Sequence, residues 1–215
     1  MEKRIEEIQN QLIERYPVLS SIQSEIENAY ELMKECFSSG HKLLIAGNGG
    51  SAADADHIVG ELMKGFVKKR PLADDIRGRL CNLDKTRGEA LSKQLQQGLP
   101  AIALHNHQAL NTAVLNDIDG TVMYAQQVCG YGQPGDIFLG ISTSGNSVDV
   151  YDAALVAKAK EMKVIGLLGK DGGRIKNVSD IAIVVPEQET YKIQELHLPI
   201  YHALCLMLEQ TFFEE

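Results

Sequence analysis

Two short segments of the sequence combine glycine with hydroxyl and amide side chains, each just before an expected helix. They are Gly47-Asn48-Gly49-Gly50-Ser51 and Ser142-Thr143-Ser144-Gly145-Asn146-Ser147. Glycine lets a ligand approach the backbone, and hydroxyls with free N–H groups at a helix start are donors for an anion. Neither segment contains lysine, so this chemistry suits a phosphate monoester held by many neutral donors. A plain polar turn with Ser147 as helix cap would explain one hydroxyl but not four.

Nucleotide-binding motifs match this sequence poorly. A Walker loop ends in Gly-Lys-Ser/Thr, which the chain lacks. The spacing of Gly47, Gly49 and Ala52 imitates a dinucleotide fingerprint, but the next expected strand ends at Leu104-His105-Asn106 without an acidic residue for a ribose. We therefore expect no nucleotide cofactor.

A second group of polar side chains lies on two expected helices. His57 and Glu61 are four residues apart and share a helix face, a pattern that is more often a surface contact than a site. Gln194 and His202 differ by about 12 Å in rise and roughly 80° in direction on an ideal helix. They could reach one point only through long side chains, a kink or a neighbouring subunit. The remaining histidines, among them His197, are interpreted as structural.

The elements that must position these side chains alternate along the chain. Strand-length apolar runs separated by helical patterns predict a parallel, doubly wound sheet. Residues 1–40 carry two helical patterns, and a long final helix is expected over 191–213, with Pro199 predicted to kink or break it. The expected strands are 43–46, 101–104, 137–141, 164–168 and 181–185.

Residues 67–98 do not fit this alternation, because they are rich in both charges and poor in large apolar groups. We interpret them as an inserted loop with a short helix. A solvated surface excursion is favoured over a substrate lid or an oligomer contact. Within it, Lys68, Lys69 and Arg70 could face either an anionic ligand or water.

Composition bounds the class of protein. A chain of 215 residues and 23.6 kDa is long enough for one domain with a packed core. No apolar stretch is long enough to span a membrane, and the first residues lack a secretory apolar segment. The net charge of -8 disfavours nucleic acid as a partner. The lack of a secretory segment predicts the cytoplasm. Four widely spaced cysteines are expected to be buried, reduced thiols.

Together, and in this order, the motifs resemble the sugar isomerase (SIS) family, specifically its phosphoheptose isomerase branch. The similarity rests on the N-terminal helices, GNGGSAADADHIVGE (47–61), Asn116-Asp117, STSGNS (142–147) and QELHLPIYH (194–202). It implies an α/β fold, a three-layer α/β/α sandwich around a five-stranded parallel sheet. The whole chain, 1–215, would be a single SIS domain with an N-terminal helical segment (1–40) and an inserted segment (67–98). It also implies a homotetramer with active sites at subunit interfaces.

The resemblance further assigns site residues. It implies a divalent metal ion, usually zinc, on His57, Glu61, Gln194 and His202. Glu61 and His202 are the implied acid–base pair, and Glu61 and Gln194 also belong to the substrate-binding set. The other implied substrate contacts are Asn48, Gly49, Gly50, Asn116 and Asp117 for the sugar chain, and Ser51, Ser142, Thr143, Ser144 and Ser147 for the phosphate.

The implied reaction is the ketose–aldose isomerisation of sedoheptulose 7-phosphate to D-glycero-D-manno-heptose 7-phosphate through an enediolate. Glu61 would be the base, His202 the acid, and the ion or backbone donors the electrophile. The insert between Phe66 and Pro100 departs from the family pattern, so another phosphosugar stays open as substrate. Two further alternatives are a non-catalytic SIS protein that binds phosphosugars or a protein partner, and a hydrolase or lyase acting on amino-sugar phosphates.

Overall fold

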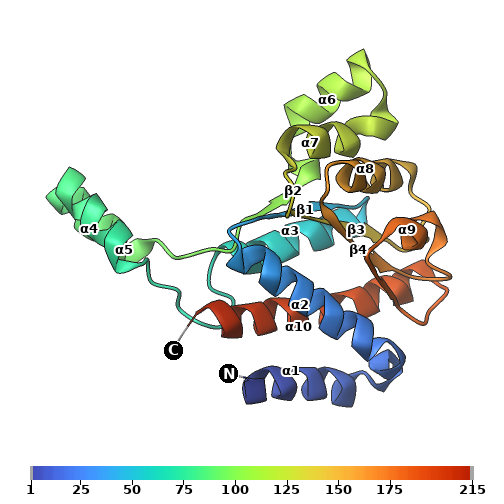
Figure 1. The fold of residues 1–215 in the computed structure, drawn as a ribbon, viewed down its shortest axis with the longest axis horizontal. Coiled ribbons are helices and arrows are strands. Elements are labelled where there is room, and N and C mark those ends of the chain that lie inside the picture. The colour runs from blue at the N-terminus through green and yellow to red at the C-terminus, as the bar shows by residue number, and fades with distance from the viewer. Residues whose placement is uncertain (1, 214–215) are drawn as a thin grey trace.

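A five-stranded, fully parallel sheet forms the centre of the protein (Figure 1). The computed structural model describes residues 2–213. The strands lie in the order β2-β1-β3-β4-β5, and each agrees with its expected run to within one residue. Their bounds are β1 Leu43–Ala46, β2 Ala101–Ala103, β3 Ile137–Ser142, β4 Lys163–Leu168 and β5 Ile181–Val184.

Helices cover both faces of the sheet, because alternate side chains of its buried strands point to opposite faces. Leu43 and Ile45 pack with one group of helices, whereas Leu44 and Ala46 pack with the other. The first group is α1 (Glu2–Arg15), the 3-10 turn η1 (Pro17–Ile22), α2 (Gln23–Ser38), α3 (Gly50–Met63) and α10 (Thr190–Phe212). The second is α7 (Met123–Tyr131), α8 (Val148–Ala159) and α9 (Gly173–Val178). The predicted three-layer α/β/α sandwich is confirmed.

The segment after β2 extends the second layer outward. It consists of the 3-10 turn η2 (Leu104–Asn106), helix α6 (Gln108–Asp117) and the 3-10 turn η3 (Gly120–Val122). Figure 1 shows α6 at the outer end of this layer, beyond α7.

Helix α10 is continuous through Pro199, which is buried within it. Of the kink or break predicted at this proline, the break is therefore wrong. A proline removes one N–H donor from a helix, but here the surrounding apolar side chains of α10 are buried in the core and hold the helix together.

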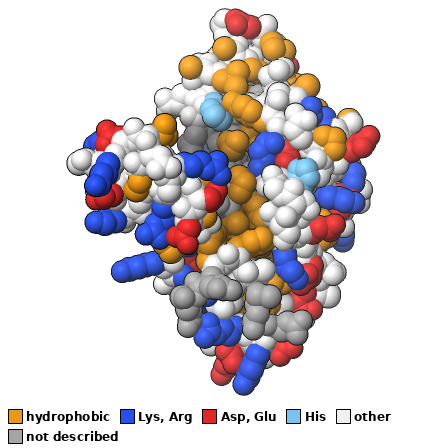
Figure 2. All heavy atoms as spheres, turned by 60° about the vertical axis from the view of Figure 1, so that its left-hand side comes forward, with side chains coloured by type: hydrophobic (Ala, Val, Ile, Leu, Met, Phe, Trp, Pro, Cys, Tyr) orange, Lys and Arg blue, Asp and Glu red, His pale blue; other side chains and the backbone are white. Residues whose placement is uncertain are grey.

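The expected insert is a helical hairpin rather than a loop with one short helix. Helices α4 (Asp74–Leu83) and α5 (Lys85–Gln94) pack against each other and project away from the sheet (Figure 1). Neither helix buries a residue except Gly88, where an added Cβ would lie 2.3 Å from the Leu80 carbonyl oxygen. Figure 2 shows the hairpin standing out at one side, covered with charged side chains beside a band of hydrophobic ones.

The base of the hairpin is fixed by a buried ion pair. Arg70 is fully buried, and its guanidinium lies 2.8 Å from Glu209 on α10. Arg70 also donates to the carbonyl oxygens of Leu62 and Glu61, at 2.7 and 2.9 Å. Arg70 thus faces neither a ligand nor water, which corrects both alternatives considered for it. Lys68, beside it, donates to the Phe213 carbonyl oxygen at 2.9 Å.

The four cysteine side chains differ in their exposure. All four thiols are free, and Cys36 and Cys205 are buried as expected. Cys81 is half-buried and Cys129 is exposed, so the prediction of burial is wrong for these two. Between residues 2 and 213 no helix combines the length and the apolar composition that crossing a membrane requires.

Candidate active site

The glycine and serine segments lie at the same edge of the sheet. The glycine segment connects β1 to α3 and the serine segment connects β3 to α8; since β1 and β3 are parallel neighbours, both loops leave their carboxyl ends. Gly145 has a φ of +64°, and an added Cβ would lie 1.9 Å from the Gly172 carbonyl oxygen. Only glycine fits there, so this turn of the serine loop is defined by its sequence.

Two of the expected phosphate-binding hydroxyls are in contact at this edge of the sheet. The Ser142 and Ser147 hydroxyls are 3.0 Å apart, and Ser142 and Ser51 are both buried. The Ser144 hydroxyl accepts a hydrogen bond from the Asn146 N–H at 3.2 Å, and Thr143 is half-buried. The serine loop is therefore a folded cluster of hydroxyls and not a plain helix cap.

One link between the two loops was not foreseen. The Asn48 side-chain amide donates to the Asp149 carboxylate at 3.0 Å, so an acidic residue in the first turn of α8 ties the glycine loop to the helix that follows the serine loop. Nothing in the local pattern around Asp149 distinguishes it from an ordinary acidic residue at a helix start.

Asn116 and Asp117 are not joined to these loops. They end α6, both are exposed, and the Asn116 amide donates to the Asp117 carboxylate at 2.8 Å. Figure 1 shows α6 at the outer end of its layer, and neither side chain forms a hydrogen bond with the two loops among the described residues.

Three of the four implied metal ligands meet where α3 packs on α10. The His57 Nε2 is 3.2 Å from the Glu61 Oε1 and 3.3 Å from the His202 Nε2. Glu61 is largely buried and its other oxygen contacts Lys64 at 3.3 Å. Burial lowers the pKa of His202, and the neighbouring His57 lowers it further. This imidazole is therefore held toward its neutral form.

Gln194 lies at a different place on the same seam. An added Cβ on Gly50 would be 2.4 Å from the Gln194 Nε2, so this amide sits over the first residue of α3. His57 is seven residues further along that helix, about 10 Å in rise. The structure thus places Gln194 beside the glycine loop and His202 beside His57, as the separation expected between them requires.

Two residues at this seam were missed by the sequence analysis. The Tyr201 hydroxyl donates to the Asp54 carboxylate at 3.1 Å and lies 3.1 Å from the His57 Nδ1. Burial raises the pKa of Tyr201, as does the neighbouring Asp54, so the hydroxyl keeps its proton. Burial also raises the pKa of Asp54, against the effects of Tyr201 and His57. Asp54 lies three residues before His57, which is the one local signal that could have indicated it.

Two other histidines have structural environments. His197 is fully buried and contacts the Leu168 carbonyl oxygen at 3.1 Å; burial lowers its pKa to about 4, so it is neutral. His105, for which the sequence suggested no partner, lies 3.0 Å from the Asp56 carboxylate.

A cavity of about 310 Å³ opens between α1 and α10 with His202 in its wall. Arg15, Tyr16 and Pro199 are among its lining residues. Its size falls at the lower end of small-molecule sites. The cavity gives His202 an open side, with a guanidinium nearby, that the packing of α3 on α10 does not cover.

The donor set has the chemistry of a zinc site without being a preformed cage. Between residues 2 and 213 no group of three or more His, Cys, Asp or Glu side chains is arranged to hold a metal ion. Imidazole nitrogens and a carboxylate oxygen are nevertheless the donors that zinc prefers, and tetrahedral ligands about 2.0–2.1 Å from zinc lie about 3.3 Å apart. The contacts of His57 with Glu61 and His202 match that spacing.

Comparison with known proteins gives concordant matches. The family model described as SIS domain matches residues 8–79 and 86–169, interrupted only at the tip of the α4–α5 hairpin. The phosphoheptose isomerase of Geotalea daltonii is 39% identical, with 98% of each chain covered. That of Nitratiruptor sp. is 38% identical, covering 97% of this chain and 100% of the relative. The solved phosphoheptose isomerase of Francisella tularensis superposes with a TM-score of 0.75 at 31% identity, covering 97% of each chain.

Proposed function

Since this chain belongs to the SIS domain family, and is similar to phosphoheptose isomerases over nearly its whole length, we propose that it isomerises sedoheptulose 7-phosphate to D-glycero-D-manno-heptose 7-phosphate. The chain is thus an aldose–ketose isomerase that acts on a phosphosugar. The observation that carries the proposal is the contact of His57 with Glu61 and His202, at 3.2 and 3.3 Å, on the helix that follows the glycine loop.

The phosphate of the substrate would be bound at the carboxyl edge of the sheet. The Ser142 and Ser147 hydroxyls already lie in contact there, and the N-terminus of α8 follows them. Ser51, Thr143 and Ser144 complete the set of hydroxyl donors. The sugar hydroxyls would lie at the adjacent glycine loop. They would be bound by Asn48, Gly49 and Gly50 of that loop and by Gln194 beside it.

The proton transfers are assigned to the two groups that meet at the seam of α3 and α10. Glu61 removes the proton from C1 of the ketose, next to the C2 carbonyl, and an enediolate forms. His202 gives a proton to the oxygen at C2 and receives the one from the oxygen at C1, while Glu61 returns its proton to C2. Each positioned acid or base contributes a factor of about 10² to 10⁴ in rate.

A divalent metal ion, zinc by donor type, would be held by His57, Glu61 and His202, with Gln194 as the remaining family ligand. When bound, such an ion polarises the carbonyl and stabilises negative charge on the enediolate oxygens. Glu61 then has two assignments, and a carboxylate on a metal ion is a weaker base. Glu61 would act as base through the oxygen that is not bound to the ion, which lies 3.3 Å from the Lys64 ammonium group.

The exposed Asn116–Asp117 pair forms no hydrogen bond with the loops of its own chain among the described residues, which supports an assembly with shared sites. We infer a homotetramer in which the Asn116–Asp117 pair of one subunit faces the loops of another. The cytoplasm, indicated by the unpaired cysteines, is the proposed location. Nucleic acid is not a proposed partner, given the net charge of -8.

The test is to incubate the purified, zinc-loaded protein with sedoheptulose 7-phosphate and to follow the sugar carbons by NMR. An aldoheptose 7-phosphate at unchanged mass is the expected product. Line broadening without turnover would contradict the isomerase assignment and indicate a phosphosugar-binding protein. A product of different mass would indicate a lyase or hydrolase, and a panel of other sugar phosphates would detect a different substrate.

A further inference from the structure

Tyr201 connects two residues of α3 that the proposed chemistry does not use together. It is buried in α10, with 2% of its surface exposed, and its ring stands edge-on to the His57 ring at 5.4 Å between centroids. Its hydroxyl lies 3.1 Å from the Asp54 Oδ1 and 3.1 Å from the His57 Nδ1. Asp54 and His57 are three residues apart and share one face of α3.

The hydroxyl has only one proton to donate. It donates that proton to the Asp54 carboxylate, which is the acceptor-only partner when ionised. Its lone pair is then left for the His57 Nδ1, and this contact is a hydrogen bond only if Nδ1 carries the imidazole proton. The chain Asp54–Tyr201–His57 thus selects one of the two neutral tautomers of His57.

The other nitrogen of His57 points to the proposed reaction centre. With the proton on Nδ1, Nε2 has a free lone pair directed at the Glu61 Oε1, 3.2 Å away, and the His202 Nε2, 3.3 Å away. A cation placed between this lone pair and the Glu61 carboxylate would interact favourably with both. The hydrogen-bond chain therefore prepares a position for a positive charge.

We propose that Asp54 and Tyr201 are positioning residues that hold the His57 imidazole with its proton on Nδ1, so that Nε2 is free to bind a metal ion. The inference rests on the proposed function for the identity of that site. Hydrogen bonding to the far nitrogen of a ligating histidine fixes its tautomer and ring orientation, and loss of such a partner typically costs about 10–100-fold in metal affinity.

The first test is made on metal-free protein labelled with ¹⁵N-histidine. Two-bond proton–nitrogen correlation spectra distinguish a protonated ring nitrogen from a bare one, and a His57→Gln variant identifies the His57 signals. We expect the proton on Nδ1 in the unmodified protein and a change toward Nε2–H in Tyr201→Phe, which lacks only the hydroxyl. Asp54→Asn, which keeps an acceptor oxygen but loses the charge, is expected to change the populations in the same direction by less.

The second test measures zinc affinity by competition with a chelator. Tyr201→Phe is expected to weaken zinc binding by about 10–100-fold. The matched control is Tyr131→Phe, an exposed tyrosine of α7, which is expected to leave both the tautomer and the zinc affinity unchanged. A purely structural role of Tyr201 would lower the stability of the protein without changing the His57 tautomer.

The inference is overturned if His57 carries its proton on Nε2 in the unmodified protein, or if Tyr201→Phe leaves the tautomer unchanged. A changed tautomer with unchanged zinc affinity would overturn the role in metal binding. Failure of the proposed function is a separate result, because the tautomer measurement requires neither metal nor substrate.

Discussion

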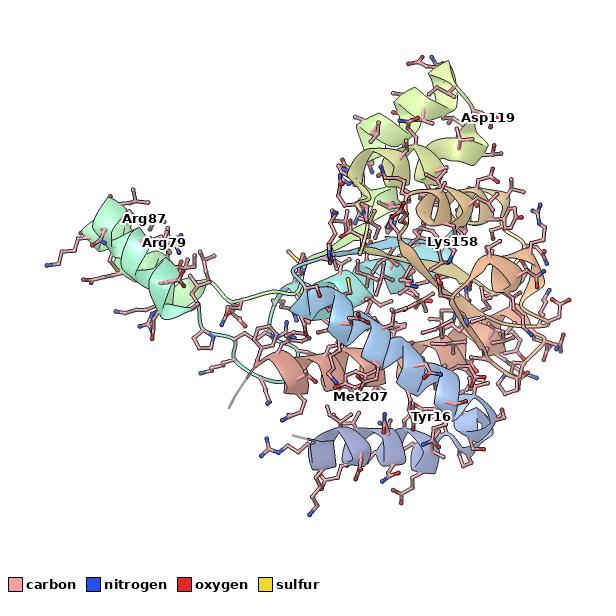
Figure 3. The ribbon with its side chains drawn as sticks, in the orientation of Figure 1. Tyr16, Arg79, Arg87, Asp119, Lys158 and Met207 are labelled. Carbon is pink, nitrogen blue, oxygen red and sulfur yellow. The ribbon has the colours of Figure 1, made fainter. Side chains whose placement is uncertain are left out.

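The C-terminal half of α10 and the α4–α5 hairpin flank the same buried ion pair but are built in opposite ways. Met207, two residues before Glu209 on α10, is fully buried, whereas Arg79 and Arg87 stand on the hairpin that projects at the left of the view (Figure 3). The ion pairs differ likewise: Arg70–Glu209 is closed to solvent, and Arg79–Asp75 is exposed. Stability and the proposed chemistry therefore depend on the packing of α10 in the core and against α3, whereas the hairpin contributes almost no buried side chain.

The largest expected difference between the two regions is in catalysis. Glu61→Gln should lower turnover of the phosphosugar by about 10²- to 10⁴-fold, because the amide cannot accept the substrate proton. The same change in the hairpin, Glu89→Gln, alters an exposed side chain and should leave turnover unchanged. Steady-state rates with unfolding curves of both variants check this. Retained activity in Glu61→Gln would remove Glu61 as the base.

The next effect is on stability. Glu209→Gln leaves the Arg70 guanidinium buried without a counter-charge, and we expect a loss of about 3–5 kcal/mol in the free energy of unfolding. Asp75→Asn breaks the exposed pair with Arg79 and should cost less than about 1 kcal/mol. Urea titrations of the two variants measure both values. Similar costs would mean that the two pairs are equally solvated.

The buried pair also predicts a pH dependence. Burial alone would raise the pKa of Glu209, but the N–H groups of Val67 and Phe66, together with Arg70, hold it below its ordinary value of 4.5. This carboxylate therefore contributes stability above pH 4.5 that is lost as the pH falls through its lowered pKa. The free energy of unfolding should fall on acidification below pH 4.5, and less steeply in Glu209→Gln. Equal slopes would contradict this assignment.

A smaller effect is expected when the hairpin itself is removed. Replacing residues 74–94 with a short glycine–serine linker removes only one buried residue, Gly88, which has no side chain. The free energy of unfolding of the remaining domain should therefore change by about 1 kcal/mol or less. We expect the deletion to change substrate preference more than phosphate affinity. Kinetics with a panel of sugar phosphates, and phosphate binding by calorimetry, compare the two. Equal effects on substrate preference and on phosphate affinity would contradict a role of the hairpin in substrate choice.

The smallest effect concerns the thiols. Burial raises the pKa of Cys36 to about 12, so this thiol should react with an alkylating reagent only on unfolding. Cys129 on α7 is exposed and should react in the folded protein. Mass spectrometry of the labelled peptides distinguishes them. Early labelling of Cys36 would indicate local opening of α2.

Most of the fold was predictable because its signals are local. Short apolar runs separated by helical patterns defined the five strands to within one residue. The glycine and serine segments marked the two loops where neighbouring strands end. The break at Pro199 was predicted from a local rule, and it failed because burial of α10 on both sides of the proline outweighs one missing hydrogen bond. The number of helices between Phe66 and Pro100 was underestimated, because short, charged helices give a weak periodic signal.

By itself the sequence determined the sheet, the two loops, and the pairing of His57 with Glu61 on one helix face, since each depends on residues close together in the chain. Only the tertiary structure decided that Arg70 is buried against Glu209, 139 residues away, and that Tyr201 reaches His57, 144 residues away. It also placed the Gln194 amide over Gly50, at the start of α3. The physical reason is that burial and long-range partners depend on how helices pack across the sheet, which no local spacing encodes.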